Sequence, residues 1–440
     1  MVLKLKPSSK SKLKSKLKSK HSSKDKITQK NIKHLYSGIQ FKTNSHEFYF
    51  TEPTFFLGSD LIIQEIIRHN TVNKFKIWFD DKLRKNKIDL SVSGFLSVWF
   101  MSQQANAVYR KDPVIPSGQQ LDFRQLIGNI KTLGGVSREK VEKMINKMNI
   151  SKKCDKLISE MEQQFNDSNI MNYEPQLTVG QLTRQRDKEK FITFTCTTNL
   201  NNELNNYTFS ISEKQLDIIF SKYKRANGLG NSKETDHFYK KCFILLMRYY
   251  TLESYNQQLA VAPSFYNYIS KRYNANTELF ASSINSTLTN YCSLFYDVEK
   301  HFNSRGSFNG MNVVKGMYVA NPPFSNDIMT VMANRIIDWL DKTNQDLGFV
   351  VTIPAWDKEE EKYGRYEPFF ILKASKYLVN VIKIPKYKAY FVDYISYREI
   401  RPVDVYVILL QNKASKNKYR INLGKDIYKY WKPHKFGNLH

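Results

Sequence analysis

The segment VANPPFSND, residues 319–327, places an amide, two adjacent prolines and an aromatic ring directly after an apolar run. Two consecutive prolines fix their own φ and restrict the residue before them, so the local carbonyl groups are held rigidly. The side-chain oxygen of Asn321 and the carbonyl of Pro322 can then accept both hydrogens of an exocyclic amine such as adenine N6. Phe324 can stack on the same base. The pattern predicts methyl transfer to an amine by positioning and electrostatics, without a strong base.

The same tetrapeptide has a plain structural alternative, a strand terminator followed by a core phenylalanine. Its surroundings favour the chemical interpretation. The strand-like GMYVA precedes it, and the amphipathic NDIMTVMANRIIDWLDKT follows it. Binding sites in open α/β sheets lie at the carboxyl ends of strands, which is where Asn321, Pro322, Pro323 and Phe324 are expected.

Charge indicates the kind of partner. The 440-residue chain has a formal net charge of +27, which favours phosphate-rich partners or an anionic membrane surface. No apolar run reaches the roughly 18 residues of a spanning helix, and the N-terminus lacks the apolar core of a signal peptide. We expect a soluble, intracellular protein that binds no membrane. The four cysteines form no CxxC and no histidine stands at ligand spacing, so we expect reduced thiols and no metal.

Three regions are expected along the chain. Residues 1–30 hold eleven lysines against one acid, which predicts a disordered tail that is either a nuclear-localisation or RNA-tethering arm or a solvated terminus. Residues 31–230 are expected to form a mainly helical RNA-binding domain with a small hairpin near 190–213.

Trp78 and Trp99 stand 21 residues apart, close to the spacing of a WW domain, but the required turns and proline are missing. We interpret both as core residues.

Residues 231–440 are expected to form a Rossmann-like α/β domain with a doubly wound, mostly parallel sheet, because short strands alternate with helices after residue 275. Strands are predicted at 277–282, 316–320, 347–354, 377–385 and 404–410, and helices at 286–295 and 326–343. A methyltransferase also needs a loop for S-adenosylmethionine after its first strand. The segment ELFASSIN is well placed but lacks the usual glycines. Asp297 and Glu299 are candidates for the cofactor ribose, with an exposed charged loop as the alternative.

Five segments resemble one known family in the same order: FASSIN, YCSLFYDVEKHFNSRGSF, VANPPFSNDIM, FVVTIPAW and VILLQN. The resemblance is to the phosphorylated-CTD-interacting-factor family of cap-specific adenosine N6-methyltransferases, and it is strongest over about 275–412. It implies a methyltransferase core beside a helical domain, S-adenosylmethionine as cofactor and capped mRNA as partner. The substrate implied is the first transcribed adenosine beside the cap, usually 2′-O-methylated.

The resemblance also implies roles for single residues. The catalytic motif falls on Asn321, Pro322, Pro323 and Phe324. The cofactor side is implied at Ala281, Ser282, Asn285, Asp297, Glu299 and Asn321. The substrate side is implied at Phe324, Asn326, Pro354, Trp356, Asp357 and Arg305. Trp356 has a core tryptophan as its alternative, and Arg305 with Gly306 can contact phosphate or brace a loop.

Departures from the family limit what is carried over. Asn326 and Asp357 stand where animal members have an acidic residue and an arginine. The family's N-terminal WW domain is expected to be missing, so binding to the phosphorylated polymerase tail is not predicted. The expected location is nuclear, or the cytoplasmic site of viral transcription if the source is a large DNA virus. Two other functions stay open: adenine methylation at internal RNA or DNA sites, and a non-catalytic basic RNA-binding protein on a methyltransferase scaffold.

Overall fold

The segments singled out by the sequence meet in one sheet. A computed structural model of the chain describes residues 39–50, 57–92, 94–106, 111–118, 121–185, 188–200, 203–229, 235–253, 258–358, 366–424 and 427–433. These residues all belong to one compact unit, Gly38–His440. The predicted tail, residues 1–30, lies outside the described residues.

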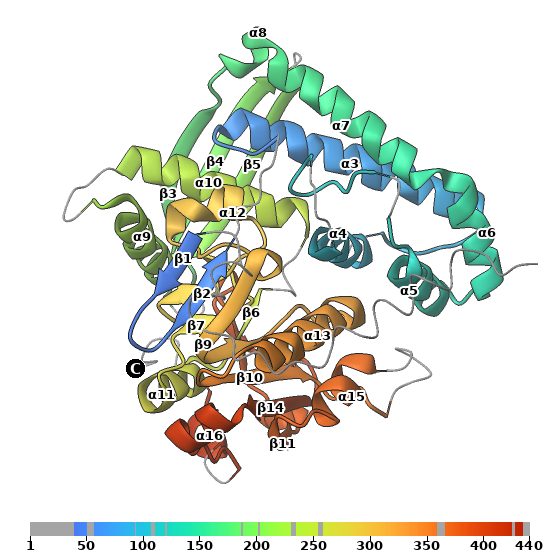
Figure 1. The fold of residues 1–440 in the computed structure, drawn as a ribbon. Coiled ribbons are helices and arrows are strands. Elements are labelled where there is room, and N and C mark those ends of the chain that lie inside the picture. Colours follow the sequence, from blue (N-terminus) through green and yellow to red (C-terminus); the bar gives the residue numbers. More distant parts are fainter. Residues whose placement is uncertain are drawn as a thin grey trace, which may run out of the picture. The chain divides into compact units, whose positions relative to one another are not determined.

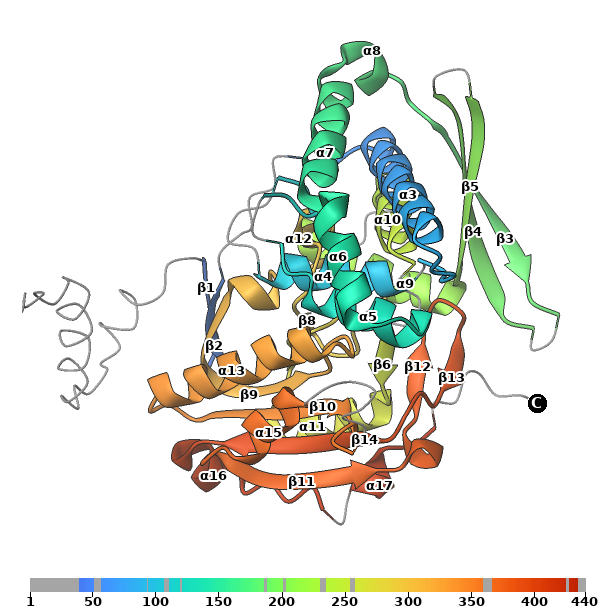
Figure 2. The same ribbon diagram turned by 90° about the vertical axis from the view of Figure 1, so that its right-hand side faces the viewer.

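The largest sheet has eight strands in the order β1-β2-β9-β10-β14-β11, with β7 also beside β9 and β8 beside β7 (Figures 1 and 2). Its strands are β1 (Ile39–Lys42), β2 (Glu47–Phe50), β7 (Thr277–Glu278), β8 (Asn290–Tyr291), β9 (Met311–Ala320), β10 (Leu347–Pro354), β11 (Leu378–Ile384) and β14 (Val405–Gln411). β8, β7, β9 and β10 run parallel to one another, so their carboxyl ends lie at one edge.

Alternating side chains of this sheet bury two separate faces. On one face, Phe349, Ile408 and their neighbours pack against α13 (Asn326–Lys342) and α15 (Glu367–Lys373). On the other face, Val319 and Val407 pack against α11 (Pro263–Tyr273) and α17 (Ile427–Tyr430), and α16 (Lys413–Tyr419) contacts β10 and β14. Figure 1 shows α13 and α15 on the opposite side of the sheet from α11 and α16. The period-two pattern of the strands thus places helices on both faces.

The remaining elements bury a third cluster, which includes Phe75, Trp99, Leu157 and Phe243. Its helices are α3 (Ile62–Lys85), α4 (Phe95–Asn106), α5 (Arg124–Gly134), α6 (Arg138–Met148), α7 (Ile150–Asn166), α8 (Ser168–Met171), α9 (Glu213–Asn227), α10 (Thr235–Thr251) and α12 (Tyr296–Glu299). Two small sheets complete the fold: β3 (Gln176–Thr183), β4 (Lys190–Leu200) and β5 (Glu203–Ser212), and β6 (Leu259–Val261), β12 (Phe391–Asp393) and β13 (Arg398–Ile400).

The α/β fold is confirmed, but the sheet is mixed and not mostly parallel. The β1–β2 hairpin joins β9 in antiparallel orientation, and β14 runs antiparallel to both β10 and β11. The segment 286–295 is not the predicted helix: it contains β8, which pairs with β7. Residues 190–212 form the antiparallel pair β4–β5, as their alternation predicts.

The tryptophans tested for WW spacing lie in the interior. Trp99 is buried, and Trp78 packs against the same cluster. The four cysteines are buried thiols without disulfides. In the described ranges, no group of three or more His, Cys, Asp or Glu is arranged to hold a metal ion. The same ranges contain no helix whose length and apolar character would let it cross a membrane.

Candidate functional site

A cavity of about 470 Å³ opens at the carboxyl ends of β7, β8, β9 and β10. It brings together the predicted residues Ala281, Asn285, Asn321, Pro322, Pro323, Phe324 and Trp356. Because the four strands are parallel, the loops that follow them all reach this edge. The volume is in the range of small-molecule pockets, roughly 300 to 1,000 Å³.

Asn321 presents an unsatisfied acceptor at this cavity. Its Nδ2 donates to the main-chain carbonyl of Leu259 at 3.0 Å, a contact that fixes the orientation of the amide. The Oδ1 atom is buried and has no hydrogen-bond partner among the described residues. A buried acceptor without a partner costs roughly 1 to 3 kcal/mol, and such a cost marks a place where a ligand donor would be stabilising.

Phe324 stands between two other aromatic rings of the cavity. Its ring makes edge-to-face contacts with Trp356, with centroids 6.1 Å apart, and with Phe391, at 6.3 Å. Phe324 follows β9, Trp356 follows β10, and Phe391 begins β12, so three separate strands position the group. The rings of Trp356 and Phe391 stand nearly perpendicular to that of Phe324, and the group gives the cavity an apolar aromatic surface on which a base can stack.

The loop after β7 forms the opposite side of the cavity. Ala281 and Asn285 line it, and Ser282 lies just behind them. Asn285 Oδ1 accepts from the Ser282 main-chain N–H at 2.7 Å, and Ser282 Oγ donates to Gln258 Oε1 at 2.6 Å. Gln258 also lines the cavity. A short polar chain therefore runs along this wall.

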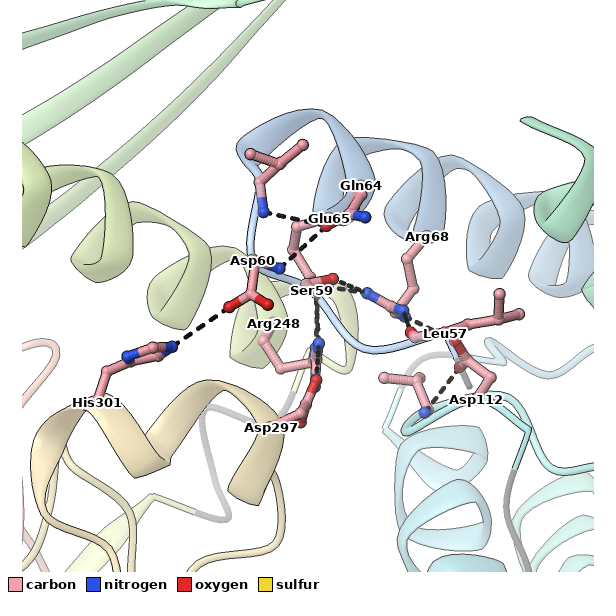
Figure 3. A network of polar contacts seen from close by, with 12 residues as sticks. Leu57, Ser59, Asp60, Gln64, Glu65, Arg68, Asp112, Arg248, Asp297 and His301 are labelled. Carbon is pink, nitrogen blue, oxygen red and sulfur yellow. Dashed lines mark hydrogen bonds and ion pairs between the residues drawn. The ribbon is translucent and has the colours of Figure 1, made fainter. Parts of the chain in front are cut away.

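Asp297 does not line the cavity, because its carboxylate is bound in a buried network of ion pairs. Arg248 donates to both Asp297 oxygens, at 3.0 and 2.9 Å, and also to both oxygens of Glu65 (Figure 3). Arg68 joins Glu65 to Asp112, at 2.7 and 2.8 Å. Although burial opposes ionisation of Glu65, the two guanidinium groups hold its pKa at about 2. The network ties α3 and α10 to α12.

Glu299 is likewise turned away from the cavity. It accepts from the hydroxyl of Tyr249 and from the main-chain N–H and hydroxyl of Ser283. Burial raises the pKa of Glu299 to about 7, more than these hydrogen bonds lower it. Tyr249 does line the cavity, so Glu299 acts there only through its neighbours.

The other predicted substrate residues lie outside the lining. The Pro354 carbonyl accepts from Tyr366 at 2.7 Å, and Asp357 accepts from Tyr406 at 2.8 Å. Asn326 begins α13. None of these three residues lines the cavity.

Arg305 and Gly306 brace the loop after β8. Arg305 Nε donates to Asn290 Oδ1 at 3.1 Å, and its guanidinium lies 4.9 Å from the centre of the Phe41 ring. Gly306 has a φ of 98°, and a Cβ there would lie 2.9 Å from the Phe50 ring. The pair therefore locks this loop against the β1–β2 hairpin.

Sequence reasoning missed the part of the cavity lining that contacts the motif from β6 and β12. Leu259, Phe391, Ile400 and Pro402 line the cavity from β6, β12 and the end of the β12–β13 hairpin. These strands are three residues long, too short for a periodic signal, and stand far from the motif in sequence. Among the described lining residues none is Asp, Glu, His, Lys or Arg. The fold and site thus define an α/β protein with an uncharged, aromatic ligand pocket at its strand ends.

Parts of the chain are similar to known proteins. A family model described as the phosphorylated CTD interacting factor 1 WW domain matches residues 215–394. The chain is similar to a Mus musculus and a Homo sapiens protein, each named mRNA (2'-O-methyladenosine-N(6)-)-methyltransferase. Each is 28% identical over 127 residues, which cover 28% of this chain and 18% of the relative. The chain thus matches less than a fifth of the length of these curated relatives.

The family match corrects one prediction. The sequence around Trp78 and Trp99 predicts that the WW domain is absent, and this prediction is wrong, because the model with that description matches residues 215–394. The matched segment folds as α9 to β12, within and beside the large sheet, so tryptophan spacing in the first third of the chain could not locate it. The ground for excluding polymerase-tail binding is thereby removed.

Proposed function

We propose that the chain is an S-adenosylmethionine-dependent methyltransferase acting on N6 of the adenosine beside an mRNA cap. The observation that carries the proposal is the buried, unpartnered Oδ1 of Asn321, at the edge where β7, β9 and β10 end. The similarity to two cap-adenosine methyltransferases supports the same chemistry.

The reacting amine would be held by two acceptors. Asn321 Oδ1 takes one N6 hydrogen and the carbonyl of Pro322 takes the other, so the nitrogen lone pair is directed toward the methyl donor. The bond from Asn321 Nδ2 to Leu259 prevents the amide from presenting its donor end instead. Phe324, with Trp356 beside it, stacks on the base that is turned out of the RNA.

The pocket suits the proposed cofactor in size and character. S-adenosylmethionine supplies a methyl group activated on a sulfonium ion. Aromatic rings and carbonyl dipoles tolerate such a cation, and the uncharged lining contains both. Ala281, Asn285 and Ser293 would hold the cofactor from the loops after β7 and β8. The predicted ribose contacts Asp297 and Glu299 would act by holding those loops, because both carboxylates are already bound.

The topology supports a Rossmann-like core. The chain goes from β7 to its neighbour β8 and then crosses to β9 on the other side of β7. Such a reversal is the switch point at which doubly wound sheets bind ligands, and the loops after β7 and β9 flank it. The formal charge of +27 favours an RNA substrate.

The test is methyl transfer with three matched RNAs: capped with a first adenosine, the same sequence uncapped, and capped with a first guanosine. Transfer to N6 of the first adenosine, fastest on the capped RNA, is expected. Equal rates on capped and uncapped RNA would reject the proposal that the enzyme requires the cap. Wild-type protein that neither transfers methyl nor binds S-adenosylhomocysteine would reject the enzyme and leave a non-catalytic RNA-binding protein.

A further inference from the structure

The loop between β7 and β8, residues 279–289, is largely buried although it contains no glycine. We call it the β7 loop. Ser282, Ser283, Ile284 and Asn285 are all buried. Buried loops are unusual, because their main-chain polar groups need partners that water would otherwise supply. A glycine-rich turn solves this problem with its own backbone freedom, and this loop needs another solution.

Helix α9 supplies part of the solution. Lys222 Nζ donates to the Ser283 carbonyl at 2.9 Å, the Ser286 carbonyl at 3.1 Å and Ser286 Oγ at 2.6 Å. These three bonds use all three donors of an ammonium group. Gln215, two turns earlier on α9, donates to the Ile284 carbonyl. Three carbonyl groups of the loop are thus held by two side chains of one helix.

Carboxylates hold the main-chain N–H groups of the same loop. Glu278 Oε1 accepts from Thr287 and Leu288, and Glu299 accepts from Ser283. Glu278 and Glu299 also face Lys222 electrostatically and favour its charge, whereas Arg225 opposes it. The Tyr291 ring lies 5.3 Å from Lys222 Nζ. Burial is the largest influence and lowers the pKa of Lys222 to about 8.

The contacts join α9 to the cavity wall. Ala281 and Asn285 line the cavity, and Lys222 and Gln215 bind the residues between and beside them without lining it. Without the hydrogen bonds from Lys222 and Gln215, the loop carbonyls would bond to other groups. The loop would then change its conformation and shift the part of the cavity wall that faces the ligand. Such a shift would alter the binding of a ligand on this wall. It would not alter the chemistry at Asn321, which follows a different strand.

We propose that Lys222 is a positioning residue for the methyl-donor subsite: it shapes the β7 loop so that Ala281 and Asn285 can hold an adenosyl-sulfonium ligand. The inference rests on the proposed function and assigns the cofactor end of that site to support from α9. Lys222 does not touch the ligand, so its removal should weaken binding while leaving the bound geometry at the motif intact.

The experiment uses the full chain and calorimetric titration with S-adenosylhomocysteine in the absence of RNA. Lys222→Met keeps the apolar stem and removes the three bonds. We expect its Kd to rise about tenfold or more, the change typical for loss of charged hydrogen bonds. KM for S-adenosylmethionine should rise in parallel, whereas kcat at saturation should stay within about threefold. Lys224→Met, two residues along the same helix and without a bond to the loop, is the matched control.

Gln215→Leu repeats the test without touching a charge and should raise the Kd in the same direction. If Lys222→Met does not fold, this variant decides alone. Unchanged Kd in the folded variants, with only a lower unfolding temperature, would overturn the inference and leave the proposed function standing. A wild-type protein that binds no S-adenosylhomocysteine would overturn both.

Discussion

The amide of Asn321 donates to the carbonyl of Leu259 at 3.0 Å, and so β6, a strand 60 residues earlier in the chain, sets the orientation of the first residue after β9. The bond commits the Nδ2 end of the amide and leaves Oδ1 as an acceptor at the cavity. Rigidity of the acceptor matters because preorganised dipoles need no rearrangement when the reaction occurs.

Asn321→Ala should therefore abolish most methyl transfer. Loss of one preorganised hydrogen-bonding group typically lowers kcat by about 10² to 10³. S-adenosylhomocysteine affinity should stay within about threefold, since Ala281 and Asn285 lie on another loop. The measurement is single-turnover transfer together with calorimetric titration.

Asn344→Ala is the control for this prediction, because Asn344 is exposed just before the amino end of β10, away from the motif. Transfer in Asn321→Ala at more than a tenth of the wild-type rate would reject the acceptor role.

Phe324→Leu should weaken the binding of RNA without weakening the binding of the cofactor. Stacking of a base on an aromatic ring contributes roughly 1 to 3 kcal/mol, so KM for RNA should rise about 5-fold to 150-fold. Trp356 and Phe391 remain to shape the pocket. Phe370→Leu on α15, whose side chain is 40% exposed, is the control. An unchanged KM for RNA would show that the base does not stack there.

Much of the fold follows from sequence period. The long strands β9, β10 and β14 alternate between two faces. β10 and β14 are predicted to within one residue at each end, and β9 only over its second half, because burial on both faces requires continuous apolar runs. The strand predicted at 277–282 begins with β7, whereas β8 lies where a helix is predicted. The loop that joins the two strands is held by tertiary hydrogen bonds with Lys222 and Glu278, which no local pattern encodes.

The candidate site was predictable to the same extent. Asn321 and Trp356 directly follow long strands, so the parallel sheet placed them at one edge. The charge of Asp297 and its position along the chain predict a contact with the cofactor ribose. Neither property reveals that Arg248 binds this carboxylate. The absence of the WW domain is predicted wrongly, because tryptophan spacing is a local signal and the WW-domain model matches residues 215–394.

The buried network around Arg248 should dominate stability in the helical part of the chain. Arg248→Met leaves the carboxylate of Asp297 without its ion-pair partner and leaves Glu65 with Arg68 alone, and breaking such a buried pair typically costs about 3 to 5 kcal/mol. Urea unfolding measures this loss. Lys143→Met, which breaks an exposed pair with Glu139, should change the free energy of unfolding by less than about 1 kcal/mol. Equal effects of the two substitutions would contradict the prediction.

Glu299 should make the protein less stable as the pH rises toward neutrality. Burial raises its pKa from 4.5 to about 7, so the folded state binds a proton that the unfolded state releases. The resulting stability is present below about pH 4.5 and is lost as the pH rises through about 7, a change of roughly 3 kcal/mol. Glu299→Gln cannot titrate at this position. Its free energy of unfolding relative to that of the wild type should therefore rise by up to this amount between about pH 5 and about pH 8. Urea unfolding at both pH values measures the gain, with the exposed Glu162→Gln as control. A difference between wild type and Glu299→Gln that is the same at both pH values would mean that Glu299 is already ionised in the folded protein at the lower pH, held by Tyr249 and Ser283.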